Sequence, residues 1–379
     1  MSGSAESGAR VESPLRRHGR TVAWVAAALV VVAGLVLPAD VMERGYSRTL
    51  FPILQKNLVP VTGAVDWPLM GSLLLAVPAL LALVGVRRWR RGRRCGEARW
   101  ALLVAGAVRL MRGALVVAAA FLLIWGLGYR RVPIEERWHL GETELLREHV
   151  ADVQMRLLRV LHEDGDRAHG DAERAWRAVA SAERELVEEL EGWLPAVPRY
   201  IKEPPDGWLM ALGIYGIVSP FTLEAHVDGA LPLPMLLGIR AHELAHLFGY
   251  CGEADANLVG FVAGLRAADP LARYGTALSM VRYAMSREDE GSAARFYKLL
   301  PERAKADLRE LSERRKRHSV PTLARVSRAV NDTYLKTQGV ALGTDDYARG
   351  FTLFVRAYRC GLVPLPPPYV PPRVAPRGR

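Results

Sequence analysis

Three long apolar runs, all within the first 130 residues or so, constrain the fold of this chain most strongly. They cover residues 21–41, 67–86 and 101–127, and each is long enough to cross the hydrocarbon core of a bilayer as a helix. A cleaved signal peptide could account for the first run alone. However, that run is long, no A-x-A cleavage site follows it, and two more runs come next. We therefore expect residues 21–128 to form three transmembrane helices in a lipid bilayer.

Charge is distributed unevenly along the chain. Residues 1–131 contain 18 Lys and Arg but only 6 Asp and Glu, a net charge of +12, whereas the remainder has a net charge of −1. Positive charge that is confined to the part with the apolar runs is typical of a membrane protein. The remainder has no excess of basic residues, which argues against nucleic-acid binding. The basic run Arg87–Arg94 separates the second and third spans, and the positive-inside rule places such a loop in the cytoplasm. We expect a multi-pass protein of the cell (cytoplasmic) membrane, with a cytoplasmic tail over residues 1–20 and an extracytoplasmic domain over residues 129–360.

The candidate chemistry lies in an H-E-x-x-H motif at His242, Glu243 and His246. Residues four apart lie on one face of a helix, so the two imidazoles can bind one metal ion. Glu243 follows the first ligand directly and is placed to take a proton from water at the metal, as in zinc hydrolases. Gly249 comes three residues after His246, where the helix is expected to end in a turn of positive φ.

A catalytic zinc ion takes three protein ligands and keeps one position open. Glu253 lies seven residues after His246, at the start of a second expected helix, and we predict that it is the third ligand. Asn257 follows one turn later and is expected to hydrogen-bond a ligand or brace the first helix. Glu253, Asn257 and Gly260 form a row of polar or small residues that can approach the H-E-x-x-H helix closely.

Two other side chains are alternative third ligands. Asp255 points about 200° round the second helix from Glu253, and a Cys251 thiolate would suggest a structural site that lacks a fourth ligand. Tyr334 and Tyr347 are candidates for stabilising the oxyanion that forms when water attacks a carbonyl group. Each of these tyrosines has a purely structural role as its alternative.

The other segments indicate a mainly helical domain. Residues 42–66 have few charges and are expected to form a loop, while residues 135–191 show a helical pattern whose charged end, residues 183–191, is expected to be solvated. Glycines and β-branched residues between 209 and 230 predict a small β-hairpin. Residues 361–379 form a Pro-rich tail.

The E-x-x-A-N sequence at Glu253, Ala256 and Asn257 resembles the third-ligand helix of gluzincin metallopeptidases. Membrane-bound gluzincins of the CAAX-prenyl-protease and heat-shock-protease group have Asp at the position of Asn257, and their spacer is longer. The short spacer containing Gly249 is similar to the turn of metzincins, whose third ligand is His. This chain has Gly252 at that position and Glu253 one residue beyond.

A wider resemblance is to a bacterial multi-pass membrane-protein family of unknown function. It rests on five motifs, which are Trp125–Pro133, Pro220–Ala225, His242–Tyr250, Glu253–Asn257 and Asn331–Gly339. This resemblance implies a zincin-like domain but no particular substrate. In zinc peptidases a strand beside the site binds extended substrate, which implies that role for the predicted hairpin. The alternative is a plain core hairpin, with Glu224 and His226 facing either the site or the surface.

The expected protein is therefore a membrane-anchored zinc-dependent metallopeptidase with one Zn²⁺ ion. It would hydrolyse peptide bonds of a peptide or protein substrate outside the cytoplasm, with no nucleic-acid partner. A catalytically silent zinc-binding scaffold is one alternative, although such a copy would be expected to lose Glu243 first. An intramembrane protease is another, but the apolar stretch Met235–Phe248 is short for a span and contains Arg240.

Overall fold

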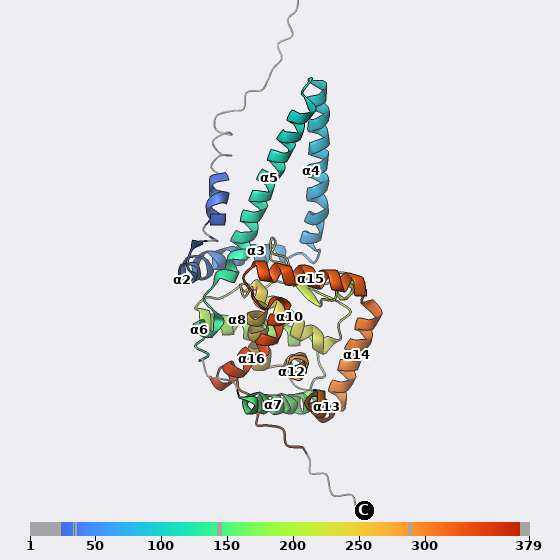
Figure 1. Ribbon diagram of the computed structural model, residues 1–379. Helices are drawn as coiled ribbons and strands as arrows, with labels where there is room; N and C mark the ends of the chain where they lie inside the picture. Colours follow the sequence, from blue (N-terminus) through green and yellow to red (C-terminus); the bar gives the residue numbers. More distant parts are fainter. Residues whose placement is uncertain (1–23, 33, 35, 142–145, 287–289, 372–379) are drawn as a thin grey trace, which may run out of the picture. The chain divides into compact units, whose positions relative to one another are not determined.

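The computed structural model describes residues 24–32, 34, 36–141, 146–286 and 290–371 (Figure 1). The predicted tail over residues 1–20 and the last eight residues of the Pro-rich tail lie outside the described residues. The chain divides into two compact units. One contains Met1–Pro38 and Leu74–Ile124, and the other contains Ala39–Leu73 and Trp125–Arg379. The fold is mainly helical, as the sequence predicts.

Two helices are long and apolar enough to span a membrane, α4 (Leu69–Arg94) and α5 (Arg99–Ile124). Their apolar windows are 0% and 6% buried, so these side chains need an apolar solvent, which indicates membrane association. The prediction of three spans is not met among the described residues. The first predicted span, residues 21–41, lies partly outside them, and its last residues belong to the other unit. The basic run is not a loop either, because α4 continues through it to Arg94.

The loop predicted over residues 42–66 is wrong. That segment is almost wholly helical and belongs to the second unit, which is globular. The helices of this segment are α2 (Ala39–Met42), of which only Met42 falls within residues 42–66, the π-helix η1 (Glu43–Leu50) and α3 (Phe51–Thr62). Tyr46, Phe51 and Val59 are buried. Phe51 packs edge-on against Trp193, with ring centroids 6.3 Å apart. Contacts with residues far away in the sequence thus order a segment whose own pattern is weak.

The rest of the globular unit is a bundle of helices with one small sheet. In chain order its elements are η2 (Gly126–Arg130), α6 (Ile134–Arg137), α7 (Arg147–Gly165), α8 (Ala172–Glu191), α9 (Trp208–Ala211), β1 (Gly216–Val218), β2 (Ala225–Val227), α10 (Leu233–Leu247), α11 (Glu253–Arg266), α12 (Pro270–Ser286), α13 (Glu290–Leu299), α14 (Glu302–His318), α15 (Pro321–Thr337), η3 (Gly343–Asp345) and α16 (Asp346–Arg359). Within the Pro-rich tail, the backbone N–H of Tyr369 donates to the carbonyl of Met155 on α7.

Helices α10 and α11 form the centre of this unit and pack against α8, α12 and α16, while α7 lies against α12 (Figure 1). Gly260 of α11 lies against α10, where an added Cβ atom would come within 3.2 Å of the backbone of Ala241 and His242. The two helices can therefore approach more closely than side chains would permit. This contact brings the start of α11 next to the end of α10.

The predicted β-hairpin is present. Strands β1 and β2 are antiparallel, with Ile217 opposite His226. Residue Lys202 forms a parallel bridge with His226 on the other side of β2. Strand β1 is therefore an edge strand, and within the described part of the chain no further strand pairs with it.

A candidate metal centre between helices α10 and α11

Three ligand-type side chains converge where α10 ends and α11 begins. His242 and His246 lie one turn apart on α10, and Glu253 is the first residue of α11. The Glu253 Oε2 atom lies 3.2 Å from His242 Nε2 and 3.4 Å from His246 Nε2. One ligand atom from each residue lies within 4.8 Å of the other two. The sequence prediction named these same three residues.

The turn between the two helices depends on Gly249. Its φ of +91° is in the left-handed region, and an added Cβ atom would lie 2.6 Å from the Phe51 ring. A side chain at this position is therefore disfavoured by both backbone strain and the lack of space. The compact turn allows Glu253 to return to the imidazoles after only six intervening residues.

The protons on the imidazoles can be assigned from their partners. His242 Nδ1 lies 2.9 Å from Asn257 Oδ1, and Asn257 Nδ2 donates to the carbonyl of Tyr347 at 3.0 Å, which fixes the orientation of the amide. His246 Nδ1 lies 2.7 Å from the backbone carbonyl of Tyr250. Each Nδ1 faces an acceptor and so carries a hydrogen. In the neutral rings each Nε2 is then an unprotonated acceptor.

Three acceptor atoms thus face one another in a largely buried site. The Glu253 carboxylate and the two Nε2 atoms have no donor between them, and Glu253 Oε2 has no hydrogen-bond partner when both rings are neutral. Acceptors that converge in this way need positive charge between them, either a proton on an imidazole or a metal cation, and two imidazoles with one carboxylate are a donor set that suits zinc. The residues present therefore fit a zinc ion.

The pKa values of the cluster also reflect its preference for positive charge. Burial lowers the pKa of His246, but the hydrogen bond and the charge of Glu253 outweigh this effect and raise that pKa to about 9. Burial raises the pKa of Glu253, but the two imidazoles outweigh it and hold that pKa well below its usual range. The carboxylate is therefore ionised and available to a cation.

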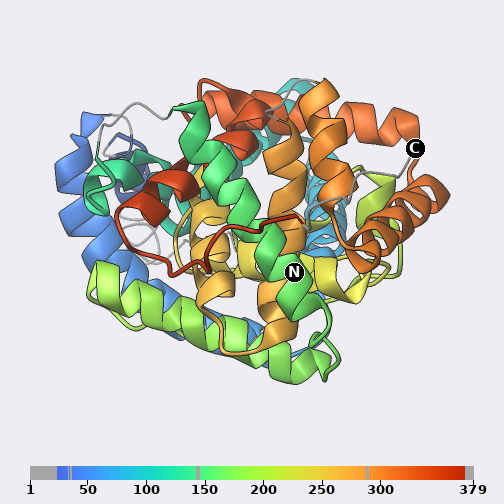
Figure 2. The same ribbon diagram turned by 90° about the horizontal axis from the view of Figure 1, so that it is seen from below.

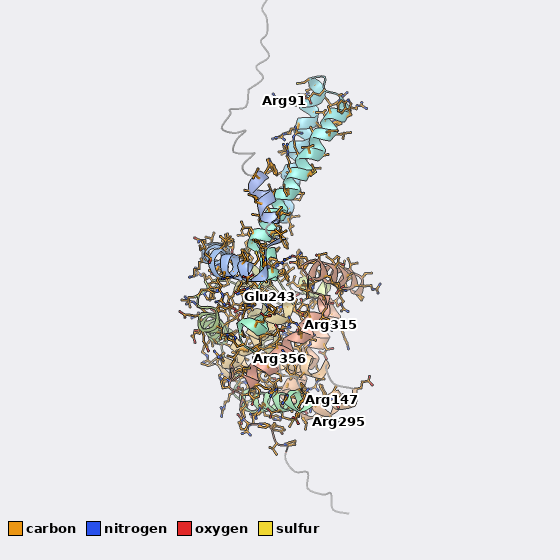
Figure 3. The ribbon with its side chains drawn as sticks, turned by 60° about the vertical axis from the view of Figure 1, so that its left-hand side comes forward. Arg91, Arg147, Glu243, Arg295, Arg315 and Arg356 are labelled. Atoms are coloured by element: carbon orange, nitrogen blue, oxygen red, sulfur yellow. The ribbon has the colours of Figure 1, made fainter. Side chains whose placement is uncertain are left out.

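Glu243 lies beside the cluster, inside the globular unit (Figure 3). Its side chain is buried, and its Oε2 atom has no hydrogen-bond partner. Burial raises the pKa of Glu243 to about 7, although the nearby His242 and His246 lower it. A carboxylate with this pKa can both accept and return a proton near neutral pH.

Neither alternative ligand joins the cluster. The Asp255 carboxylate points toward Arg137 and Arg349, each at 3.6 Å. The Cys251 thiol donates to the backbone carbonyl of Trp125, and burial raises its pKa to about 12, so it is not a thiolate. Helical phase and packing thus direct Glu253, and not Asp255, to the imidazoles.

A cavity of about 220 Å³ opens onto Glu243 and His242. Its walls come from the segment before β1, from β1 itself and from α10, α11, α12, α15 and α16. They include Tyr215, Gly216, Tyr283, Ser327, Arg328 and Asn331. Gly216 is essential to this arrangement, because a Cβ atom there would lie 2.3 Å from Glu243 Oε1. The backbone of β1 therefore runs directly past the carboxylate.

Over residues 46–355 the chain matches the family described as "Protein of unknown function (DUF3810)". It belongs to that family. The match spans all three converging ligands and Glu243, and it confirms the expected membership of a family of unknown function. No curated protein and no solved structure matches the chain.

Of the two candidate tyrosines of this DUF3810 protein, only Tyr347 lies at the cluster. Its ring is stacked near that of His242, with centroids 6.0 Å apart, and burial together with the nearby Glu253 carboxylate raises the pKa of its phenol well above the usual value. The Tyr334 hydroxyl instead accepts a hydrogen bond from Trp125 Nε1 at 2.9 Å.

Glu224 and His226 face neither the cavity nor the surface. Glu224 is buried in an ion pair with Lys202, and it accepts hydrogen bonds from the backbone N–H groups of Leu69 and Met70 at 3.0 and 2.8 Å. His226 is buried within the small sheet. Glu224 therefore binds the first turn of α4.

Sequence reasoning missed a buried ionic network behind the cluster. Glu191, expected on a solvated face, accepts hydrogen bonds from Tyr250 Oη at 3.1 Å and from Arg131 at 2.8 Å, and it also pairs with Arg137. Tyr250 is the residue whose backbone carbonyl holds His246. The only sequence signal was Arg131 itself, in the motif after the last apolar run.

Proposed function

We propose that this DUF3810 protein is a membrane-anchored zinc-dependent metallopeptidase. The observation that carries the proposal is the convergence of two imidazole Nε2 atoms and one carboxylate oxygen beside Glu243, whose buried Oε2 atom has no hydrogen-bond partner. A zinc ion bound there supplies Lewis acidity, which activates water and polarises a carbonyl group.

Each residue of the site has a separate role in the proposed peptide hydrolysis. His242, His246 and Glu253 hold the ion, while the amide of Asn257 and the carbonyl of Tyr250 fix the two ring orientations. Glu243 takes the proton of the attacking water and later gives it to the leaving amine. Its raised pKa, about 7, suits both steps.

The free edge of β1 is suited to binding an extended peptide. Hydrogen bonds from Ser219 N to Glu224 O and from Asp228 N to Tyr215 O show that alternate residues face β2. By the antiparallel pattern, the backbone groups of Gly216 and Val218 point to the other edge. Gly216 also lines the cavity, so a peptide added to this edge would pass Glu243. Tyr347 is the candidate donor to the developing oxyanion.

The same proposal assigns an orientation in the cell membrane. The basic end of α4 and the turn before α5 lie in the cytoplasm by the positive-inside rule, and the globular unit lies outside it, together with its peptide or protein substrate. A reporter enzyme fused after residue 131 should then be active outside the cytoplasm, and one fused at Arg93 inside. The reverse pattern would contradict this orientation.

The decisive experiment compares full-length wild type with Glu243→Gln. Both proteins should bind about one zinc ion per chain, because Glu243 is not a ligand. Peptide ends that appear outside the cytoplasm with wild type should disappear with Glu243→Gln and persist with the surface control Glu189→Gln. Absence of zinc from the wild type, or identical peptide ends in all three strains, would sink the proposal.

A further inference from the structure

The free edge that β1 offers to a peptide is short on the side that leads back toward α9. Gly216 lies against Glu243, and three residues earlier, at Gly213, the backbone has a φ of +76° and turns into α9. A strand rises about 3.3 Å per residue, so roughly 10 Å of edge separates Gly213 from Gly216. A peptide on this edge therefore has room for about three residues between Glu243 and the turn.

Helix α15 closes the groove at this turn. A Cβ atom added to Gly213 would come within 2.9 Å of the Ala324 side chain, and the backbone N–H of Val320 donates to the carbonyl of Ala211 at 3.4 Å. In two perpendicular views α15 lies along one side of the globular unit (Figures 1 and 2). Because the helix is in contact with the turn, an extended peptide cannot continue along the edge past Gly213. The groove is closed on this side.

Arg328 lies near this closed end. It is one turn from Ala324 on α15, and it lines the same cavity as Glu243. Among the residues that line the cavity it is the only Arg or Lys. Its side chain has no carboxylate partner within the described residues, and Asp332, one turn further along α15, pairs instead with Lys336 at 2.7 Å. A positive charge without a partner is therefore available to a molecule in the cavity.

The cavity holds its charged groups at different depths. Glu243 is buried and Arg328 is exposed, so the carboxylate lies at the floor and the guanidinium at the mouth. The apolar and aromatic lining residues are Leu212, Ile214, Tyr215, Ile239, Phe261 and Tyr283. The volume is about 220 Å³, and an apolar cavity of about 150 Å³ is already large enough for benzene. The cavity can therefore hold one large apolar or aromatic side chain.

Charge decides which end of a peptide suits the closed end of the groove. A peptide antiparallel to β1 would bring its C-terminus toward Gly213, whereas a parallel peptide would bring its N-terminus there. A guanidinium forms strong charge-assisted hydrogen bonds with a carboxylate, and it repels an ammonium group. Arg328 therefore favours the antiparallel direction, with a C-terminal carboxylate at the closed end.

We propose that Arg328 binds the C-terminal carboxylate of the substrate and that the cavity holds an apolar side chain next to it. This inference rests on the proposed peptidase function and adds a substrate class, the free C-terminal ends of peptides. Hydrolysis would release a fragment of about three residues at most. Water supplies the hydroxyl of the new carboxyl group on the shortened peptide, and its proton goes through Glu243 to the amine of the released fragment.

Binding of short peptides to the full-length protein in lipid nanodiscs tests this recognition without cleavage. The protein carries Glu243→Gln so that the probes stay intact. The probes are acetyl-Leu-Phe with a free carboxylate and the same peptide as its C-terminal amide, and NMR titration gives both Kd values. The acid should bind about tenfold or more tightly than the amide, as expected for hydrogen bonds to a charged group.

Two substitutions on α15 assign this preference to one side chain. Arg328→Gln should abolish the difference between acid and amide. Arg325→Gln is the matched control and should retain it, because Arg325 is exposed on the same helix but does not line the cavity. Equal binding of the two probes would overturn the proposal. A preference that survives Arg328→Gln would also overturn it, because the carboxylate would then be bound at the ligand cluster.

A third probe distinguishes a chain terminus from an acidic side chain. Acetyl-Leu-Glu amide has a carboxylate but no free C-terminus, and it should bind no more tightly than acetyl-Leu-Phe amide. If it instead matched the acetyl-Leu-Phe acid, Arg328 would recognise acidic side chains and the proposed substrate class would be wrong.

The positions of the cleavage sites separate this inference from the proposed function. Peptide ends that depend on Glu243 should lie within about three residues of the original C-termini. Glu243-dependent ends in the interior of chains would overturn the inference and leave the zinc peptidase intact. A carboxylate preference that depends on Arg328 in a protein without zinc would support the carboxylate site and contradict only the proposed hydrolysis.

Discussion

The Oδ1 atom of Asn257 lies 2.9 Å from Nδ1 of His242, in a hydrogen bond that joins α11 to the first imidazole of α10. The other end of the same amide donates to the carbonyl of Tyr347 on α16. One side chain therefore fixes the tautomer of His242 and ties three helices together behind the ligand cluster. An aspartate here would accept from His242 but could not donate to Tyr347.

Replacing Asn257 should weaken metal binding without abolishing it. Asn257→Ala removes the acceptor that orients His242, and loss of such an outer partner costs roughly 10–100-fold in metal affinity. Competition with a fluorescent zinc chelator measures the change. Asn331→Ala is the matched control, because Asn331 lines the cavity but contacts neither imidazole in the structure, so its zinc affinity should equal that of the wild type. Equal losses in both variants would contradict the assigned role.

The two carboxylates of α11 should differ sharply in their effects on zinc. Glu253→Gln removes a ligand and its charge, so zinc affinity should fall by more than the roughly 100-fold typical of an outer partner. Asp255→Asn should leave zinc affinity nearly unchanged, because Asp255 faces Arg137 and Arg349. Zinc content after dialysis against chelator distinguishes the two. A larger loss in Asp255→Asn would reverse the ligand assignment.

Gly216→Ala should uncouple zinc binding from hydrolysis. The new methyl group would lie 2.3 Å from Glu243 Oε1 and must displace that carboxylate. A shift of about 1 Å in a catalytic group costs on the order of 100-fold in rate. Cleavage of any substrate identified through Glu243→Gln should fall by that factor while zinc content stays constant. Gly45→Ala is the control, since no atom lies within 4 Å of a Cβ added there. Full activity of Gly216→Ala would show that Glu243 is placed differently.

Glu191→Ala should destabilise the globular unit severely. The Glu191 and Arg137 side chains are 1% and 2% exposed, so the substitution leaves buried positive charge without its partner, at a cost of about 3–5 kcal/mol. Glu189→Ala, two residues earlier, removes a carboxylate that is 52% exposed and pairs with Arg266, which costs about 0–1 kcal/mol. Thermal unfolding of both variants tests the contrast. Equal melting temperatures would mean that the buried network does not stabilise the fold.

Local geometry accounts for what the sequence alone determined. The apolar lengths of α4 and α5 follow from the thickness of a bilayer, and the four-residue spacing of His242 and His246 places both rings on one helical face whatever surrounds them. Gly249 marked the end of that helix because only glycine adopts its φ without strain. These features depend on residues that are neighbours in the chain.

Only the tertiary structure decided the features that depend on packing between distant segments. Helical phase in the sequence favoured Glu253 over Asp255, but it is the approach of α11 to α10 at Gly260 that brings Glu253 within reach of the imidazoles. Residues 42–66 become helical because the globular unit buries their side chains. Glu191 looks like any surface charge in the sequence, and it is buried because Arg131 and Arg137, more than fifty residues earlier, neutralise it there.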